Sequence, residues 1–336
     1  MKIFMIRCIA ACLLMCAALS AQTRKILYLN GDDASVRELQ SVSTKVRIVP
    51  VTRGDVMREI ADADAFIGEI RPEEVRAGKN LKWVQSYTAG VERFLGVPGS
   101  EALRNSSIIL TNNRITQGPE IADHAFAMLL FLTRRLDLFL KDAPRRPDQY
   151  FPVELNGRTA LVIGVGGIGT QIALRAWASG MDVIGVDPEE KPYTPYVKRI
   201  VKPDHLNEVL PLADIVFVSA PHTQASYKMV GPQQFELMKQ DAYFIAVSRG
   251  ALYDTNALVK ALDSRRLAGA GVDVTDPEPL PRDHPLRKFP NVIVTPHIAG
   301  HSDKSVARMF GTVKENVRRF ANGEPLVNVV DKQKGY

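Results

Sequence analysis

Three polar residues in the second half of the chain could together carry out one reaction. Arg249 follows the apolar run "AYFIAVS", Glu278 lies in the Pro-rich loop of "GVDVTDPEPLP", and His297 follows another apolar run in "VTPHIAG". An arginine can bind a carboxylate and polarise the carbonyl beside it, and a histidine can move a proton. A glutamate near that histidine orients the ring and favours its charged form. These residue types therefore indicate proton transfer at an oxygen next to a carboxylate.

Taken singly, each of these residues has an ordinary structural explanation. Arg249 could be a surface residue after a strand, Glu278 a charge in a loop and His297 a cap at a strand end. Their occurrence together, in this order and beside the glycine motif described next, favours catalysis. Acidic pairs such as Asp32–Asp33 lack the histidine or cysteine spacing of a metal site, so we expect no metal ion.

The segment "GVGGIG", residues 164–169, has the G-x-G-x-x-G pattern of a dinucleotide-binding turn. It follows the buried-strand run "TALVI" and precedes a helical run, which is the context that such a turn requires. Gly164 permits the tight bend, Gly166 lets backbone N–H groups approach a pyrophosphate, and Gly169 lets helix and strand pack closely. The predicted cofactor-binding residues are Gly164, Gly166, Gly167, Ile168, Gly169, Asp187 and Asp273.

Asp187 closes the strand after the glycine motif and predicts which dinucleotide binds. A carboxylate there accepts hydrogen bonds from the ribose hydroxyls and repels a 2′-phosphate. No arginine follows it directly, and Glu189 and Glu190 add repulsion. The sequence therefore predicts NAD rather than NADP. The remaining alternative is a glycine-rich turn needed only for packing, with Asp187 an exposed residue at a strand end.

Short β-branched runs alternate with helical patterns throughout the chain, which predicts an α/β fold with parallel sheets. A first block contains five expected strands, at 25–30, 45–51, 65–68, 82–87 and 107–112. A long helix is expected over 118–142. A second block then contributes six expected strands, and a helix is expected over 303–323. The predicted architecture is two Rossmann- or flavodoxin-like doubly wound parallel-sheet domains with a cleft between them.

The glycine motif, "VSRGALYD", "DVTDPEPLP" and "TPHIAG" occur in this order, and together they resemble the D-isomer-specific 2-hydroxyacid dehydrogenase family. The resemblance covers nearly the whole chain from about residue 25 to 330. It implies an NAD-binding Rossmann domain over 117–298 and a flavodoxin-like substrate domain made of 22–116 plus 299–336. It also implies a homodimer, because the helix that begins "GPEIADHAFAMLL" lines the dimer interface in relatives.

The same resemblance implies a role for each residue that matches a family motif. Arg249 matches the arginine that orients the substrate, His297 the general acid/base, and Glu278 its partner. The stretch "SYTAGVERF" matches the substrate loop, where backbone N–H groups of Ala89, Gly90 and Val91 would hold the carboxylate. Thr275 departs from the family pattern, in which a bulky apolar residue is frequent at this position. Formate dehydrogenases of the superfamily replace the glutamate by glutamine, so Glu278 argues against their chemistry.

Composition and charge set broad limits on the class of protein. The chain has 46% hydrophobic and 24% charged residues, as ordinary globular proteins do. Its net charge of +6 comes from scattered basic residues, so a nucleic-acid partner is not favoured. The expected ligand is a small 2-oxo or 2-hydroxy acid.

The first 21 residues have the pattern of a secretory signal peptide. A basic head with Lys2 and Arg7 precedes twelve apolar residues, and the small residues Ser20 and Ala21 fit a cleavage site. The apolar run is too short to span a bilayer. We therefore predict export to the periplasm. A lipid-anchored form and a start codon placed upstream of the true one, which would leave the protein in the cytoplasm, remain alternatives.

The sequence thus predicts an NAD-dependent oxidoreductase that interconverts a D-2-hydroxy acid and a 2-oxo acid by hydride transfer. The alternative is a non-catalytic NAD(H)-binding sensor or interaction protein of the same fold, which would need the glycine motif but not Arg249, Glu278 and His297.

Overall fold

A computed structural model describes residues 23–139 and 151–336. The described residues form two compact units. Unit 1 comprises 23–87, 97–111 and 313–330, and unit 2 comprises 88–96, 112–139, 151–312 and 331–336. The predicted signal peptide, residues 1–21, lies outside the described residues. The domain boundaries at 117 and 298 stay a prediction.

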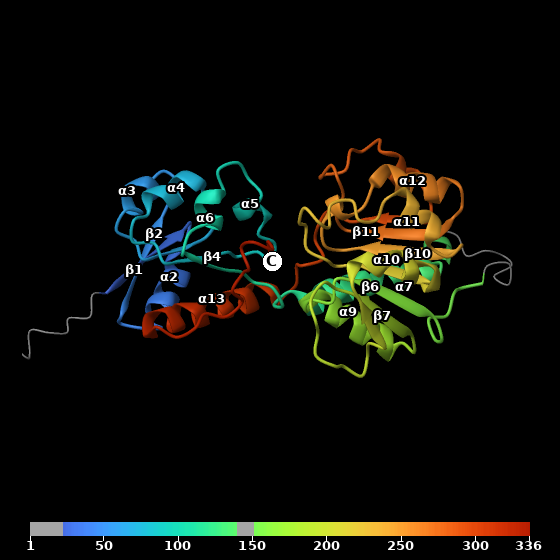
Figure 1. Cartoon of the computed structure of the whole chain (residues 1–336), viewed down its shortest axis with the longest axis horizontal. Helices are drawn as coiled ribbons and strands as arrows, with labels where there is room; N and C mark the ends of the chain where they lie inside the picture. Colours follow the sequence, from blue (N-terminus) through green and yellow to red (C-terminus); the bar gives the residue numbers. More distant parts are fainter. Residues whose placement is uncertain (1–22, 140–150) are drawn as a thin grey trace, which may run out of the picture. The chain divides into compact units, whose positions relative to one another are not determined.

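Unit 1 is built on a five-stranded parallel sheet with the strand order β2-β1-β3-β4-β5. Its strands are β1 (Arg24–Leu29), β2 (Val46–Val51), β3 (Ala65–Ile67), β4 (Trp83–Gln85) and β5 (Ile109–Thr111). This is the order of a flavodoxin-like sheet, so the predicted class of this block is confirmed. Its helices are α2 (Asp33–Gln40), α3 (Val56–Glu59), α4 (Pro72–Ala77), α6 (Glu101–Arg104) and the second half of α13 (Ser305–Asn322). Figure 1 shows this unit in blue and cyan, with α13 in red.

Unit 2 contains a seven-stranded parallel sheet with the order β12-β11-β10-β9-β6-β7-β8. Its strands are β6 (Thr159–Ile163), β7 (Asp182–Val186), β8 (Arg199–Val201), β9 (Ile215–Val218), β10 (Ala242–Ala246), β11 (Leu267–Val272) and β12 (Val292–Val294). Six of them match the predicted runs. The sequence analysis missed β8, because it is three residues long and only partly buried. The order reverses between β9 and β6, where α/β sheets of this kind bind ligands.

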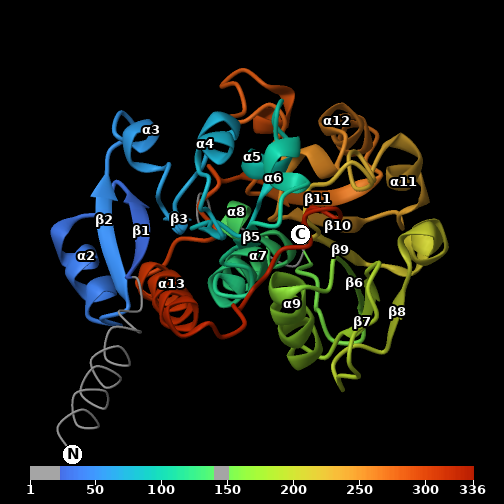
Figure 2. The same cartoon turned by 60° about the vertical axis from the view of Figure 1, so that its left-hand side comes forward.

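The helices of unit 2 are α5 (Glu92–Leu95), α7 (Gly118–Thr133), α8 (Leu136–Phe139), α9 (Gly167–Ala178), α10 (Leu206–Val209), α11 (Pro232–Leu237), α12 (Thr255–Asp263) and the first half of α13. Among them, α7, α9 and α12 pack against strands of this sheet. Helix α7 packs beside α9, as Figure 2 shows. It ends at Thr133 rather than at the expected residue 142, because Arg135 adopts a left-handed φ of 55° that stops the helix. The rest of the predicted span, 140–142, lies outside the described residues.

The central strands of unit 2 are buried on both faces, which explains their nearly continuous apolar runs. Every residue of β9 and β10 is buried. Phe126 of α7 stacks on Phe217 of β9 with 5.6 Å between ring centroids. None of the helices in 23–139 and 151–336 is long and apolar enough to cross a membrane. Because its central strands are buried on both faces, this sheet holds the loops at its carboxyl edge, where the candidate site lies.

Candidate active site

The three predicted catalytic residues follow three neighbouring strands of unit 2. Arg249 comes three residues after β10, Glu278 six residues after β11 and His297 three residues after β12. These strands are adjacent and parallel, so their carboxyl ends share one edge of the sheet. The glycine loop follows β6 at the same edge. The fold thus brings all the predicted chemistry to one side of unit 2.

His297 and Glu278 form a direct pair. Their Nδ1 and Oε1 atoms are 2.6 Å apart, and their side chains are 41% and 40% exposed. Because the carboxylate accepts from Nδ1, the other ring nitrogen, Nε2, is the one left to face a substrate. The backbone at His297 has a left-handed φ of 55°. The pair has the geometry of an acid/base histidine oriented by a carboxylate.

Asp273, at the end of β11, fixes the loop that carries His297. Its side chain is buried, and Oδ1 accepts from Ile298 N at 2.9 Å and from Thr295 Oγ1 at 2.6 Å. Oδ2 accepts from Ala299 N at 2.9 Å, and the Asp273 carbonyl accepts from His297 N at 2.8 Å. The predicted role of Asp273 as a cofactor ligand stays a prediction. The contacts in the structure give it a positioning role for the His297 loop.

Replacing Asp273 by Ala is expected to lower the free energy of unfolding by roughly 3 kcal/mol, because it leaves two backbone N–H groups without an acceptor at about 1–3 kcal/mol each. Urea unfolding followed by circular dichroism measures this loss. The matched control is Asp182→Ala, which removes a half-exposed carboxylate paired with Lys198 at 2.6 Å. That change is expected to cost less than about 1 kcal/mol. Equal losses in the two variants would contradict the role of Asp273.

Arg249 lies against the predicted substrate loop. Its Nε donates to Glu92 Oε1 at 2.8 Å and its Nη1 to the Ser248 carbonyl at 2.6 Å. A Cβ atom on Gly90 would overlap with Arg249 Nη2 as it lies in the structure, so the loop backbone approaches the guanidinium closely. The guanidinium therefore lies beside one of the three residues predicted to hold the substrate carboxylate.

The partner Glu92 is a functional residue that the sequence analysis missed. Burial by itself raises the pKa of Glu92, but the charge and hydrogen bond of Arg249, a backbone hydrogen bond and the charge of His222 together outweigh it, and the pKa lies below the usual range. Glu92 is thus an anion that holds the guanidinium in place. Its position directly after "AGV" in the predicted substrate loop could have drawn attention to Glu92. Nothing in the sequence, however, indicates that Glu92 pairs with Arg249, 157 positions away.

The carbonyl groups of the substrate loop are tied back to the protein. Ala89 O accepts from Asn112 Nδ2 at 2.6 Å, and Gly90 O accepts from Thr88 Oγ1 at 2.8 Å. In a trans peptide the N–H group points opposite to the carbonyl. The N–H groups of Gly90 and Val91 therefore point away from these partners, as an anion-binding loop requires.

The glycine loop has the geometry that a dinucleotide needs. Gly164 has a left-handed φ of 89°, and a Cβ atom on Gly169 would collide with the Gly164 carbonyl. Gly167 packs against the backbone of Ile115, and Ile168 packs against the core. Neither residue therefore presents a side chain to a ligand. A Cβ atom on Gly166 would meet nothing within 4 Å. The space over Gly166, at the N-terminus of α9, fits a pyrophosphate.

Asp187 lies beside this loop and is almost fully buried. Its Oδ2 accepts from Val165 N at 2.8 Å, its Oδ1 accepts from Glu189 N at 2.9 Å, and Lys191 Nζ lies 3.1 Å from Oδ1. The carboxylate therefore connects the glycine loop to the loop after β7. This is the position from which an acidic residue would reach a ribose.

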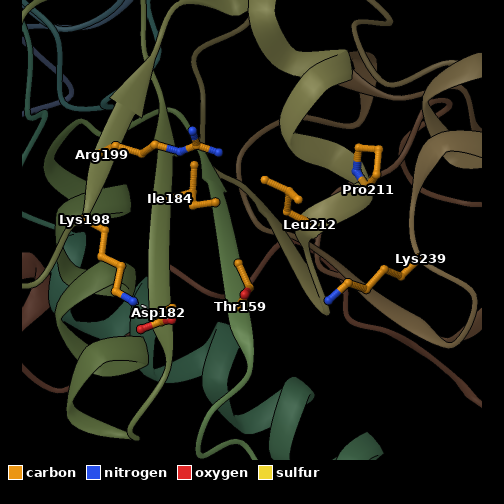
Figure 3. Close-up of a pocket in the computed structure, with 8 residues that line it drawn as sticks. All are labelled: Thr159, Asp182, Ile184, Lys198, Arg199, Pro211, Leu212 and Lys239. Atoms are coloured by element: carbon orange, nitrogen blue, oxygen red, sulfur yellow. Dashed lines mark ion pairs between the residues drawn. The ribbon is translucent and has the colours of Figure 1, made fainter.

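A cavity of about 370 Å³ lies at the opposite edge of the sheet. Figure 3 shows its lining, in which Thr159 and Asp182 are the first residues of β6 and β7, and the Lys198–Asp182 ion pair stands at its side. The glycine loop and His297 are at the other ends of their strands. This cavity is therefore separate from the candidate active site.

Comparison with known proteins agrees with this geometry. Residues 126–299 match the family described as "D-isomer specific 2-hydroxyacid dehydrogenase, NAD binding domain". A glyoxylate reductase of Thermofilum pendens is 31% identical over 295 residues, which cover 84% of this chain and 86% of the relative.

Two solved structures extend the likeness to the fold. A D-isomer specific 2-hydroxyacid dehydrogenase family protein of Aeromonas salmonicida is 29% identical, with a TM-score of 0.74 over 92% of this chain and 99% of the other. A D-isomer specific 2-hydroxyacid dehydrogenase of Xanthobacter autotrophicus, in complex with NADPH and MES, is 24% identical with a TM-score of 0.78 over 94% and 100%. The chain therefore belongs to the D-isomer specific 2-hydroxyacid dehydrogenase family and is an oxidoreductase that acts on CH–OH groups with a nicotinamide dinucleotide.

Proposed function

We propose that this protein reduces a small 2-oxo acid to the D-2-hydroxy acid with NADH, and catalyses the reverse reaction, with His297 as the acid/base. The observation that carries the proposal is the His297–Glu278 pair at 2.6 Å, on the same sheet edge as Arg249 and the glycine loop. The name of the Thermofilum pendens relative makes glyoxylate the first substrate to test.

Each residue of the site has one task in this reaction. Arg249 Nη2, with the N–H groups of Gly90 and Val91, binds the substrate carboxylate and fixes the adjacent carbonyl. The bound dinucleotide supplies the hydride that reduces C2. His297 Nε2 donates a proton to the carbonyl oxygen, and Glu278 keeps the ring in the orientation that this transfer needs. In the reverse direction His297 removes the proton from the hydroxyl.

The cofactor in this proposal is NAD rather than NADP. Asp187 supports it, because a carboxylate beside the ribose repels a 2′-phosphate, and no arginine follows it in "DPEEKP". The similar Xanthobacter autotrophicus protein holds NADPH, so both forms belong in the assay. The residues of the site fit a dinucleotide, since the space over Gly166 suits the pyrophosphate and Asp187 suits the ribose.

The assembly and location are also proposals. We infer a homodimer formed through α7, whose Leu130 is 40% exposed although the helix is largely apolar. Light scattering that gives a monomer mass would contradict it.

We infer export, because residues 1–21 combine a basic head, an apolar run and small cleavage residues. Protein found in the cytosol with these residues intact would contradict export.

The test of the activity is a panel of 2-oxo acids with NADH and with NADPH. Glyoxylate, hydroxypyruvate, pyruvate and phenylpyruvate cover small, polar and aromatic side chains, and oxidation of the dinucleotide is followed by absorbance. At least one acid is expected to be reduced, faster with NADH, to a product of D configuration where a stereocentre forms. Tight NADH binding with no turnover on any acid would instead favour the non-catalytic sensor.

A further inference from the structure

Residues 331–336 form a closed turn in unit 2. Gly335 N donates to the Asp331 carbonyl at 2.8 Å, and Asp331 N donates to the Tyr336 carbonyl at 3.0 Å. The Asp331 side chain accepts from Gln333 N at 2.9 Å and from Lys334 N at 3.0 Å. These bonds hold the six residues in one conformation. We call this segment the closing turn.

The closing turn contacts the loop on one side of the glycine loop and lies close to the loop on the other side. Lys334 Nζ lies 2.6 Å from Glu189 Oε1, and the Tyr336 hydroxyl donates to the same oxygen at 2.9 Å. On the other side, Gly335 lies close to Thr223, since a Cβ atom placed on Gly335 would be 3.8 Å from Thr223 Cγ2. Glu189 follows β7 and Thr223 follows β9.

The strand order shows where the closing turn lies relative to the glycine loop. In the sheet β6 lies between β9 and β7, and β6 leads into the glycine loop. A segment that contacts the loop after β7 and lies close to the loop after β9 is therefore next to the glycine loop, at the edge where dinucleotides bind. Glu189, which the closing turn contacts, also donates its backbone N–H to Asp187 Oδ1 at 2.9 Å, so the turn lies near the predicted ribose carboxylate.

The contact between the closing turn and Glu189 joins an ionised carboxylate to a lysine and a neutral tyrosine. Lys334 and Tyr336 lower the pKa of Glu189, so its carboxylate is ionised. Burial, and then the hydrogen bond to Glu189, raise the pKa of Tyr336 to about 12, so its hydroxyl remains a donor at neutral pH. Lys191 also lowers the pKa of Glu189, but without the ion pair to Lys334 more of the negative charge of Glu189 would act on an anionic cofactor.

We propose that the closing turn is part of the dinucleotide site, where Lys334 neutralises Glu189 and Tyr336 forms a wall of the adenosine half. Lys334 is then a specificity-determining residue, because it controls how strongly this edge repels phosphate. Its effect is larger for a nucleotide with a 2′-phosphate, which adds negative charge near Asp187 and Glu189. The proposal rests on the dinucleotide site and not on the identity of the 2-oxo acid.

The test measures binding of nucleotide fragments to the full chain by calorimetry, with no 2-oxo acid present. Lys334→Ala is expected to raise the Kd of ADP-ribose roughly two- to fivefold, as for loss of one exposed ion pair, and that of 2′-phospho-ADP-ribose more. The matched control is Lys198→Ala, which removes another 2.6 Å ion pair at the opposite edge of the sheet. It is expected to leave both Kd values unchanged.

A second comparison tests whether Lys334 acts by neutralising Glu189 or by contacting the nucleotide itself. In a Glu189→Gln background, Lys334→Ala is expected to have little further effect, because the charge that it neutralises is gone. An equal loss in that background would overturn the role of Glu189. Unchanged or tighter binding of both fragments in Lys334→Ala would overturn the proposal, since tighter binding would mean that the closing turn competes with the cofactor. These results stand whether or not any 2-oxo acid is reduced.

Discussion

Replacing His297 by Asn is expected to lower kcat for 2-oxo acid reduction by roughly 10²- to 10⁴-fold, the usual contribution of a positioned proton donor. Asn is the appropriate replacement because it tolerates the left-handed φ of 55° at this position better than most residues. The Asn side chain cannot donate a proton as an acid. Steady-state rates at saturating dinucleotide measure the effect.

Binding of NADH should change little in this variant, which separates loss of proton transfer from loss of the site. The matched control is His205→Asn, since His205 also pairs with a carboxylate, Glu208, at 2.8 Å but lies after β8. This control is expected to retain parental kcat. If His297→Asn keeps full activity on every acid that the parent reduces, His297 is not the acid/base.

The second large effect is expected at Arg249. Arg249→Ala should lower kcat/KM for the 2-oxo acid by roughly 10²- to 10³-fold, because it removes a charged partner and leaves Glu92 facing the substrate carboxylate. Much of the loss should appear in KM, because the arginine also binds the ground state. Arg249→Lys keeps the charge but not the forked geometry, so an intermediate loss is expected.

Two further variants sharpen this prediction. Adding Glu92→Gln to Arg249→Ala should recover part of kcat/KM, since it removes the uncompensated charge. The control Arg175→Ala removes an arginine of similar exposure, 26% against 28%, that pairs with Asp123. It is expected to leave KM unchanged. An Arg249→Ala enzyme with parental KM and kcat would contradict the substrate-binding role.

The sequence was sufficient for features that depend on local pattern. Continuous apolar runs predicted the buried strands β9 and β10, because a strand covered on both faces needs no polar residue. The glycine motif predicted the turn before α9, since the left-handed Gly164 and the tightly packed Gly169 leave few alternatives. The resemblance to a family then pointed to Arg249, Glu278 and His297.

Features that depend on contacts between distant residues were not predictable in this way. Glu92 gains its role only because the fold brings it 2.8 Å from Arg249. Asp273 is predicted to bind the cofactor, and only the hydrogen bonds to Ile298 and Ala299 reveal that it also holds the loop that carries His297. The closing turn was missed because its short polar sequence has no hydrophobic period, and its position depends on contacts with Glu189.

The exposure of His297 has a consequence for the reaction that we propose. Its ring is held by Glu278 and by the backbone of its loop, and it is still 41% exposed. Because the ring is partly exposed, solvent has access to it in the described structure. In the reaction that we propose, the ring would then recover its proton from solvent after each reduction, without an internal chain of proton carriers.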